Sequence, residues 1–368
     1  MRIAFYAPLK SPDHPVPSGD RRVAQLFFAA LRVAGHDAFL ASRFRSYEGR
    51  GDLLHQARLA ALGARHARRF LRRCQEAPRT APELWFTYHL YHKAPDWLGP
   101  VISDALGIPY VVAEASDAPK QALRSWAAGR DAAESAIRRA DAVIGLNPAD
   151  RDCVLPLLRD PWRWVAFKPF LDAVAYRRRA RGSVEPLRLI AVAMMRYGDK
   201  LSSYRILGDA LSRVLDLPWS LEVVGDGPAR RDVEVALDPL KERVIWAGAL
   251  DPAEITTRLA SADLCVWPAL NEAFGMALLE AQASGLPVVA GGGGGVSEIV
   301  VSEVTGLLVP PGDALAFAEA VRSLIVDRGR RAVFAEAAQR RVEAEHDLPT
   351  AASRLAAVID TLSRVHPA

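Results

Sequence analysis

The chain lacks any long uninterrupted hydrophobic run, although half of its 368 residues are hydrophobic. A helix that crosses a bilayer needs about 20 consecutive apolar residues, so the sequence predicts no such helix. The first residues read directly into a strand, and no signal-peptide pattern precedes it. The sequence therefore predicts a cytoplasmic protein that is long enough for two domains, each with its own core.

Cysteine is also scarce, and its three copies, Cys74, Cys153 and Cys265, show no metal-binding spacing. No zinc-finger, basic-zipper or RNP-type pattern is present, so the sequence predicts no nucleic-acid partner. The net charge of +4 is unevenly divided. Residues 1–184 hold 29 Lys and Arg against 18 Asp and Glu, whereas residues 185–368 hold 18 against 25. The basic half indicates either an anionic partner or an uneven solvated surface.

Short β-rich runs alternate with helical patterns along the whole chain. Several runs, such as LRLIAVAMM from residue 187, are nearly continuous in apolar residues, which is typical of strands buried on both faces of a parallel sheet. The alternation predicts an α/β class with doubly wound parallel sheets. The expected strands are 3–7, 38–41, 84–88, 110–113, 142–145, 165–167, 187–193, 221–224, 244–247, 264–267, 288–290 and 306–309.

A domain boundary is expected near residues 170–186. The polar and charged stretch Arg177–Ser183 separates a turn at Pro169 from the strong strand that begins at Leu187. Each side has the length of one Rossmann-like domain. The predicted domains are 1–175 and 185–368, with a last helix that can pack back on the first of them. Such a pair of domains presents ligands with a cleft between the carboxyl ends of the two sheets.

The segment 271–285, NEAFGMALLEAQASG, holds two carboxylates in different settings. Glu272 lies in a turn after an expected strand, and Glu280 lies within the helix that follows. A small-residue turn before a helix lets backbone amides and the helix dipole approach a phosphate. The carboxylates suit hydroxyl recognition in a sugar. The alternative, a helix cap at Glu272 and a buried ion pair at Glu280, has equal weight on spacing alone.

This segment resembles the E-x7-E region of retaining glycosyltransferases with the GT-B fold, especially those of glycosyltransferase family 4. The neighbouring runs VVGDGPARRDVE from residue 223 and TGLLVPPGDALAFAEAV from residue 305 are similar to the same family. The resemblance implies two Rossmann-like domains and a donor that is a nucleoside diphosphate sugar. It also implies transfer with retention to an alcohol acceptor, without a metal or another cofactor.

The resemblance also implies roles for single residues. Glu280 would bind the ribose hydroxyls of the nucleotide, and Glu272 would bind hydroxyls of the donor sugar. The donor would also lie against Gly19, Gly225, Ala273, Phe274, Gly275 and Met276. Gly19 follows Ser18, and this pair is equally consistent with a plain helix start capped by the serine.

A cationic pair that neutralises the diphosphate matches Arg196 and Lys200, which join Glu272 as predicted catalytic residues. Fixed cations stabilise the charge that develops on the leaving group. The family usually has five residues from the arginine to the lysine, whereas this chain has four, so Arg205 is an alternative to Lys200. The same departure leaves open a non-catalytic relative that binds a sugar nucleotide as a partner subunit.

The acceptor side is less specific. The family often has a histidine after the fourth strand of its first domain, and this chain has none there. His89, Glu114 and Asp117 are the candidates at neighbouring strand ends, and the sequence does not identify the hydroxyl acceptor or the oligomeric state. The helix that carries the arginines between Arg58 and Arg73 is either a peripheral contact with anionic lipid or a solvated face.

Overall fold

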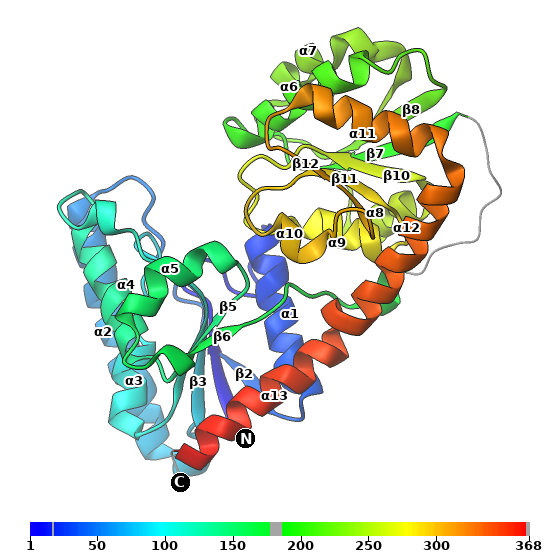
Figure 1. Cartoon of the computed structure of the whole chain (residues 1–368). Helices are drawn as coiled ribbons and strands as arrows, with labels where there is room; N and C mark the ends of the chain where they lie inside the picture. Colours follow the sequence, from blue (N-terminus) through cyan, green and yellow to red (C-terminus); the bar gives the residue numbers. More distant parts are fainter. Residues whose placement is uncertain (17, 177–185, 366–368) are drawn as a thin grey trace. The chain divides into compact units, whose positions relative to one another are not determined.

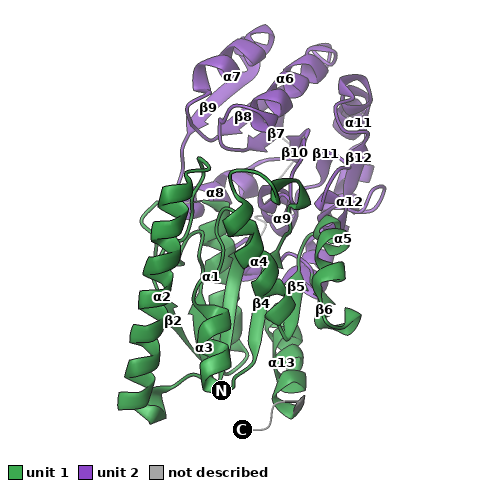
Figure 2. Cartoon of the chain, turned by 90° about the vertical axis from the view of Figure 1, so that its left-hand side faces the viewer, with its two compact units in different colours: residues 1–167, 348–368 green, residues 168–347 purple. Residues whose placement is uncertain are grey.

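The computed structural model describes residues 1–16, 18–176 and 186–365. By their internal contacts these divide into two compact units (Figure 2), of which unit 1 comprises 1–167 and 348–368, and unit 2 comprises 168–347. The last helix, α13 (Leu348–Val365), thus belongs to unit 1, where it packs against α1 (Gly19–Val33). The charged stretch Arg177–Ser183, which the sequence indicated as the boundary, lies outside the described residues.

Unit 1 is built on a six-stranded parallel sheet in the order β2-β1-β3-β4-β5-β6. Aromatic rings fill its core, including the stacked pair Phe5 and Phe86. In Figure 1, α2, α3 and α4 lie on one side of this sheet and α1 and α13 on the other. The strands are β1 (Arg2–Tyr6), β2 (Asp37–Ser42), β3 (Leu84–Leu90), β4 (Tyr110–Ala115), β5 (Ala142–Gly145) and β6 (Trp164–Ala166). Its other helices are α2 (Leu53–Glu76), α3 (Gly99–Leu106), α4 (Ala127–Arg139) and α5 (Arg151–Val154).

Unit 2 repeats the architecture with the strand order β12-β11-β10-β7-β8-β9, also parallel. Helices α6, α7 and α11 lie on one side of the sheet, and α8, α9 and α12 on the other (Figure 1). The strands are β7 (Leu187–Val192), β8 (Trp219–Val224), β9 (Val244–Gly248), β10 (Leu264–Trp267), β11 (Val288–Gly291) and β12 (Gly306–Val309). The helices are α6 (Asp199–Ser212), α7 (Arg230–Leu237), α8 (Pro252–Ser261), α9 (Met276–Ala283), α10 (Val296–Ile299), α11 (Ala314–Val326) and α12 (Arg328–Arg341).

The twelve expected strands are all present, and both sheets are doubly wound, so the predicted α/β class is confirmed. The cause is visible in the burial, because the middle residues of β7, β10 and β11 are fully covered. Within the described ranges no helix is both long and apolar enough to cross a membrane.

Each sheet contains one point at which the strand order reverses, and this point positions the sites described below. In unit 1 it lies between β1 and β3, and in unit 2 between β7 and β10. The loops after two such strands lead away to opposite faces of the sheet. They leave a crevice at the carboxyl ends, where open α/β sheets bind ligands.

Candidate functional site

The reversal point of unit 2 carries the residues that the sequence analysis assigned to the donor. Lys200, in the first turn of α6 after β7, forms an ion pair with Glu272 in the loop after β10. The indole Nε1 of Trp267 donates to the same Glu272 oxygen over 3.0 Å. The lysine ammonium lies 5.5 Å from the centre of the Trp267 ring, within the range of a cation–π contact. Glu272 is therefore held by two donors and does not cap a helix.

The loop 268–275, here called the donor loop, is fixed to α6 by further contacts. The amide of Leu270 donates to Ser203 Oγ over 3.1 Å, and Asn271 Nδ2 donates to Asp199 Oδ1 over 3.0 Å. Ala269 and Asn271 adopt φ values of 53° and 49°. A left-handed conformation costs about 1–2 kcal/mol in a residue with a side chain, less for asparagine. The contacts with α6 hold the loop in a shape that its own backbone disfavours.

The other side of the donor loop rests on the glycine run before α10. A Cβ on Gly294 would lie 2.2 Å from the carbonyl oxygen of Glu272, and one on Gly295 would lie 2.2 Å from that of Ala273. The amide of Gly295 also donates to the Ala273 oxygen over 2.9 Å. This contact fixes the carbonyls, so the backbone that leads to Phe274 and Gly275 is held in one position.

The donor loop ends at Gly275, which has φ 76° and precedes α9 without any side-chain cap. The first amides of a helix have no partner within it, so those of α9 are available to an anion. Phe274 and Met276 pack their side chains partly against the core of unit 2. Glu280, one turn into α9, accepts a hydrogen bond of 3.0 Å from the Tyr176 hydroxyl. Tyr176 is thus one partner of Glu280 among the described residues.

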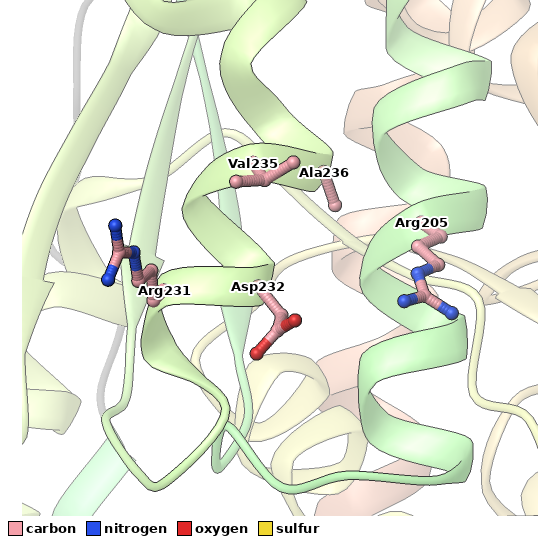
Figure 3. A pocket seen from close by; sticks show the side chains of 5 residues that line it. All are labelled: Arg205, Arg231, Asp232, Val235 and Ala236. Atoms are coloured by element: carbon pink, nitrogen blue, oxygen red, sulfur yellow. The ribbon is translucent and has the colours of Figure 1, made fainter.

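The two candidate cations differ in their surroundings. Arg196 is exposed, and within the described residues its guanidinium has no hydrogen bond or ion pair. Arg205 lies one turn beyond Lys200 but faces another helix. It lines a cavity of about 240 Å³ between α6 and α7, together with Arg231, Asp232, Val235 and Ala236 (Figure 3). The structure thus brings Lys200, and not Arg205, to Glu272.

Gly225 lies beside this group after β8. It has φ 141°, and a Cβ there would lie 1.9 Å from the carbonyl oxygen of Ala193. The amide of Met195 donates to the Asp226 carbonyl over 3.0 Å, so the loops after β7 and β8 are locked together. Gly225 therefore has a structural role beneath the loop that carries Arg196, and this role is independent of any contact between Gly225 and a ligand.

The acceptor-side candidates lie in unit 1, and the structure separates them. His89, on β3, contacts Asp20 of α1 and is an electrostatic neighbour of Glu114 on β4. Asp117 is different, because Arg130 binds both of its oxygens at 3.0 and 3.1 Å and its side chain is almost completely buried. Arg130 therefore holds both oxygens of Asp117 in a bidentate ion pair.

Gly19 is the first residue of α1, and a Cβ there would have no neighbour within 4 Å. Ser18 caps this helix, because its hydroxyl accepts from the amide of Arg21 over 3.2 Å. The helix start that was one of the two readings is therefore present, and the open space at Gly19 leaves room for a ligand as well.

The sequence analysis missed Asp20, Trp267 and Tyr176, which contact three of its candidates. Asp20 follows Gly19 directly and lies at the reversal point of its sheet, so the strand order would have indicated it. The described residues include no group of three or more His, Cys, Asp or Glu side chains that could hold a metal ion.

Comparison with known proteins identifies proteins that this chain is similar to. Residues 186–327 match the family model described as glycosyl transferases group 1. The alpha-D-kanosaminyltransferase of Streptomyces kanamyceticus is 28% identical over 235 residues, which are 61% of each protein. The D-inositol 3-phosphate glycosyltransferase of Salinispora tropica is 49% identical over 80 residues, 22% of this chain and 17% of that protein. The chain thus spans less than two thirds of the length of these relatives.

Solved structures resemble the whole chain. The Anabaena HepE protein in complex with UDP-glucose superposes with a TM-score of 0.70 over 98% of this chain and all of that one, at 19% identity. The sucrose-phosphate synthase of Thermosynechococcus elongatus gives a TM-score of 0.75 over 99% of both chains, at 21% identity. These likenesses confirm the GT-B fold. The family match confirms the resemblance to group 1 glycosyltransferases for the greater part of unit 2.

Proposed function

We propose, on the premise that residues 186–327 form a group 1 glycosyl transferase domain, that the chain transfers a sugar from a nucleoside diphosphate sugar to an alcohol acceptor. The observation that carries the proposal is the pairing of Lys200 with Glu272 across the reversal point between β7 and β10. The bond to be broken joins an anionic diphosphate to a sugar that carries hydroxyl groups, and a cation beside a carboxylate can bind both. The lysine suits the diphosphate, and the carboxylate suits the hydroxyls of the sugar.

In this proposal the bound donor separates Lys200 from Glu272, and each of the two side chains contacts the donor instead. Lys200 turns from Glu272 to the diphosphate, joined by the exposed Arg196 and by the amides at the start of α9. Glu272 then accepts hydrogen bonds from the sugar, and Glu280 from the ribose. As the bond from the anomeric carbon to the phosphate oxygen breaks, its electron pair stays on that oxygen, where the fixed cations stabilise it.

The finer parts of the proposal are retention and metal independence. The acceptor oxygen forms its bond to the anomeric carbon on the face that the diphosphate leaves, and the leaving phosphate oxygen takes the acceptor proton. Two cationic side chains and a helix N-terminus supply the positive charge that a metal would otherwise provide.

A donor screen tests the proposal. The purified chain is incubated with UDP-, GDP-, ADP- and TDP-sugars, with methyl α-D-glucoside or D-inositol 3-phosphate as alcohol acceptor, and nucleoside diphosphate release is measured. We expect release with one nucleotide class, unchanged by EDTA, and a product whose anomeric proton coupling matches that of the donor. Tight donor binding that raises the melting temperature without any release would instead support a binding protein. Inversion or loss of activity in EDTA would overturn the finer parts.

We also propose that α2 contacts an anionic membrane surface from the cytoplasmic side. Its six arginines are all exposed: Arg58, Arg65, Arg68, Arg69, Arg72 and Arg73. Only Arg72 has an acidic neighbour among the described residues, Glu76 at 3.9 Å. Leu53 and Leu54 at the start of the same helix are also largely exposed. A basic helix with exposed leucines suits the interface of a bilayer that carries negative lipids.

Sedimentation with vesicles of phosphatidylglycerol and phosphatidylcholine tests this contact. Each basic residue near such a surface contributes about 1 kcal/mol, so replacing Arg65 and Arg69 with glutamine should weaken binding roughly 30-fold. The matched control replaces Arg205 and Arg231, which are exposed arginines of unit 2, and should change binding little. If both double variants lost vesicle binding equally, the binding would depend on net charge and not on α2.

A further inference from the structure

The reversal point of unit 1 carries a pair of side chains that the proposed chemistry does not yet use. Asp20 lies in the first turn of α1, directly after the loop from β1, and His89 lies near the end of β3. Their atoms Oδ1 and Nδ1 are 3.1 Å apart. Because β1 and β3 are the strands between which the order reverses, the pair lies where an open α/β sheet binds its ligand.

The backbone at this place is held in a disfavoured conformation. His89 has φ 62° and Glu114, on the neighbouring strand β4, has φ 60°. The two positions are level with each other, because Tyr88 pairs with Ala113 and Leu90 with Ala115. Each left-handed residue costs about 1–2 kcal/mol, and such positions gather at functional sites. The left-handed backbone therefore takes His89 and Glu114, at the ends of adjacent strands, out of the regular alternation of side chains along a strand.

One nitrogen of the His89 imidazole faces a carboxylate, and the other does not. Nδ1 lies 3.1 Å from Asp20 Oδ1, an ion-pair contact without hydrogen-bond geometry, and the rings of Tyr88 and Tyr91 contact its sides. In the described part of the chain Nε2 has no hydrogen bond or ion pair, and 28% of the side-chain surface is accessible. An imidazole that turns Nδ1 toward a carboxylate presents Nε2 to a ligand that approaches the sheet edge.

The charges around the ring come from four elements. Burial lowers the pKa of His89, but the contact and charge of Asp20, with Glu114 and Asp150, outweigh burial and raise it. Burial raises the pKa of Glu114 to about 7, and that of Asp150 to about 6, although His89 opposes both shifts. Asp20 keeps a lowered pKa, since His89 and Lys10 offset its burial. Glu114 and Asp150 therefore titrate near neutral pH in the electrostatic neighbourhood of His89.

We propose that His89 Nε2 accepts a hydrogen bond from the acceptor hydroxyl and that Asp20 positions the ring for this contact. This inference rests on the proposed glycosyl transfer, whose donor residues lie in unit 2. His89 is then a substrate-contacting residue, and Asp20 a positioning residue that acts through it. Protonated His89 has no lone pair on Nε2, so acceptor binding weakens as the pH falls through the pKa of this histidine.

Kinetics of three variants test the pair. His89→Leu, which has no hydrogen-bond acceptor in its side chain, should raise the KM for the acceptor about tenfold, the cost of one hydrogen bond, and leave the KM for the donor unchanged. Asp20→Asn removes the charge that raises the pKa of His89, so the acid limb of kcat/KM for the acceptor should move to lower pH. His92→Asn is the matched control, because this ring packs against Trp126 and lies outside the pair.

An unmoved acid limb in Asp20→Asn, or an equal shift in His92→Asn, would overturn the inference while the transferase activity stands. A second measurement does not depend on turnover. Methyl α-D-glucoside titrated into the labelled protein should shift the imidazole resonances of His89 and not those of His92. If the wild-type chain releases no nucleoside diphosphate, the proposed function fails, and this titration still decides whether His89 binds an alcohol.

Discussion

Replacing Lys200 with alanine is expected to lower turnover of the donor about 100- to 1,000-fold, the loss typical of one group that stabilises a developing anion. Lys200 is the cation that the structure brings to Glu272, across the reversal point of the second sheet. Its removal leaves Arg196 as the one remaining cationic side chain of the proposed site, beside the amides at the start of α9. Steady-state release of nucleoside diphosphate, with the melting temperature as a check on folding, measures the effect.

Arg205→Ala is the control for this experiment, because the two residues share α6 and a positive charge. Arg205 faces the cavity beside α7 (Figure 3), so its removal should change turnover less than twofold. The opposite result, a large loss in Arg205→Ala with Lys200→Ala active, would reassign the diphosphate to Arg205. It would also mean that the shortened spacing after Arg196 changes which residue reaches the site.

Gly225→Ala is expected to destabilise unit 2 by about 3 kcal/mol or more, or to prevent its folding. A methyl group there would lie 1.9 Å from the carbonyl oxygen of Ala193, which is backbone and has no rotamer to change. In addition, φ 141° is strained for any residue with a side chain. For a unit of this size the melting temperature should fall by about 10 °C.

The matched control is Gly248→Ala at the end of the neighbouring strand β9. Gly248 has φ 70°, but a Cβ there meets nothing within 4 Å, so only backbone strain of about 1–2 kcal/mol applies. Calorimetry of the two variants separates the steric contact from the strain. If both variants lost the same small amount of stability, the loops after β7 and β8 would move apart readily. Gly225 would then have no structural role, and only its contact with a ligand would remain as its proposed role.

The fold could be predicted from the sequence because its information is local. Runs such as Leu187–Val192 are buried on both faces, and their composition alone identifies them as central parallel strands. The order of the strands is not local. Nothing in the sequence around β7 indicates that β10, more than 70 residues later, becomes its neighbour, and this adjacency brings Lys200 to Glu272.

The sequence proposed members of the candidate site and did not indicate their contacts. The motif around Glu272 and Glu280 identified both carboxylates, but neither the indole of Trp267 nor the hydroxyl of Tyr176 was expected to bind them. Asp117 was selected because it follows a strand end, and the structure pairs it with Arg130. The position of a residue after a strand places its backbone in the fold, but does not indicate which residue its side chain contacts.

The glycines beneath the donor loop have a consequence for engineering. Gly294 and Gly295 leave no room for a methyl group under the carbonyls of Glu272 and Ala273, while Ser203 holds Leu270 from the other side. The loop therefore has no independent shape that could be transplanted. An exchange of donor preference with a relative would have to move three separate segments together: the loop, the glycine run and the first turn of α6. Insertions would be tolerated only at positions away from the contacts among these three segments.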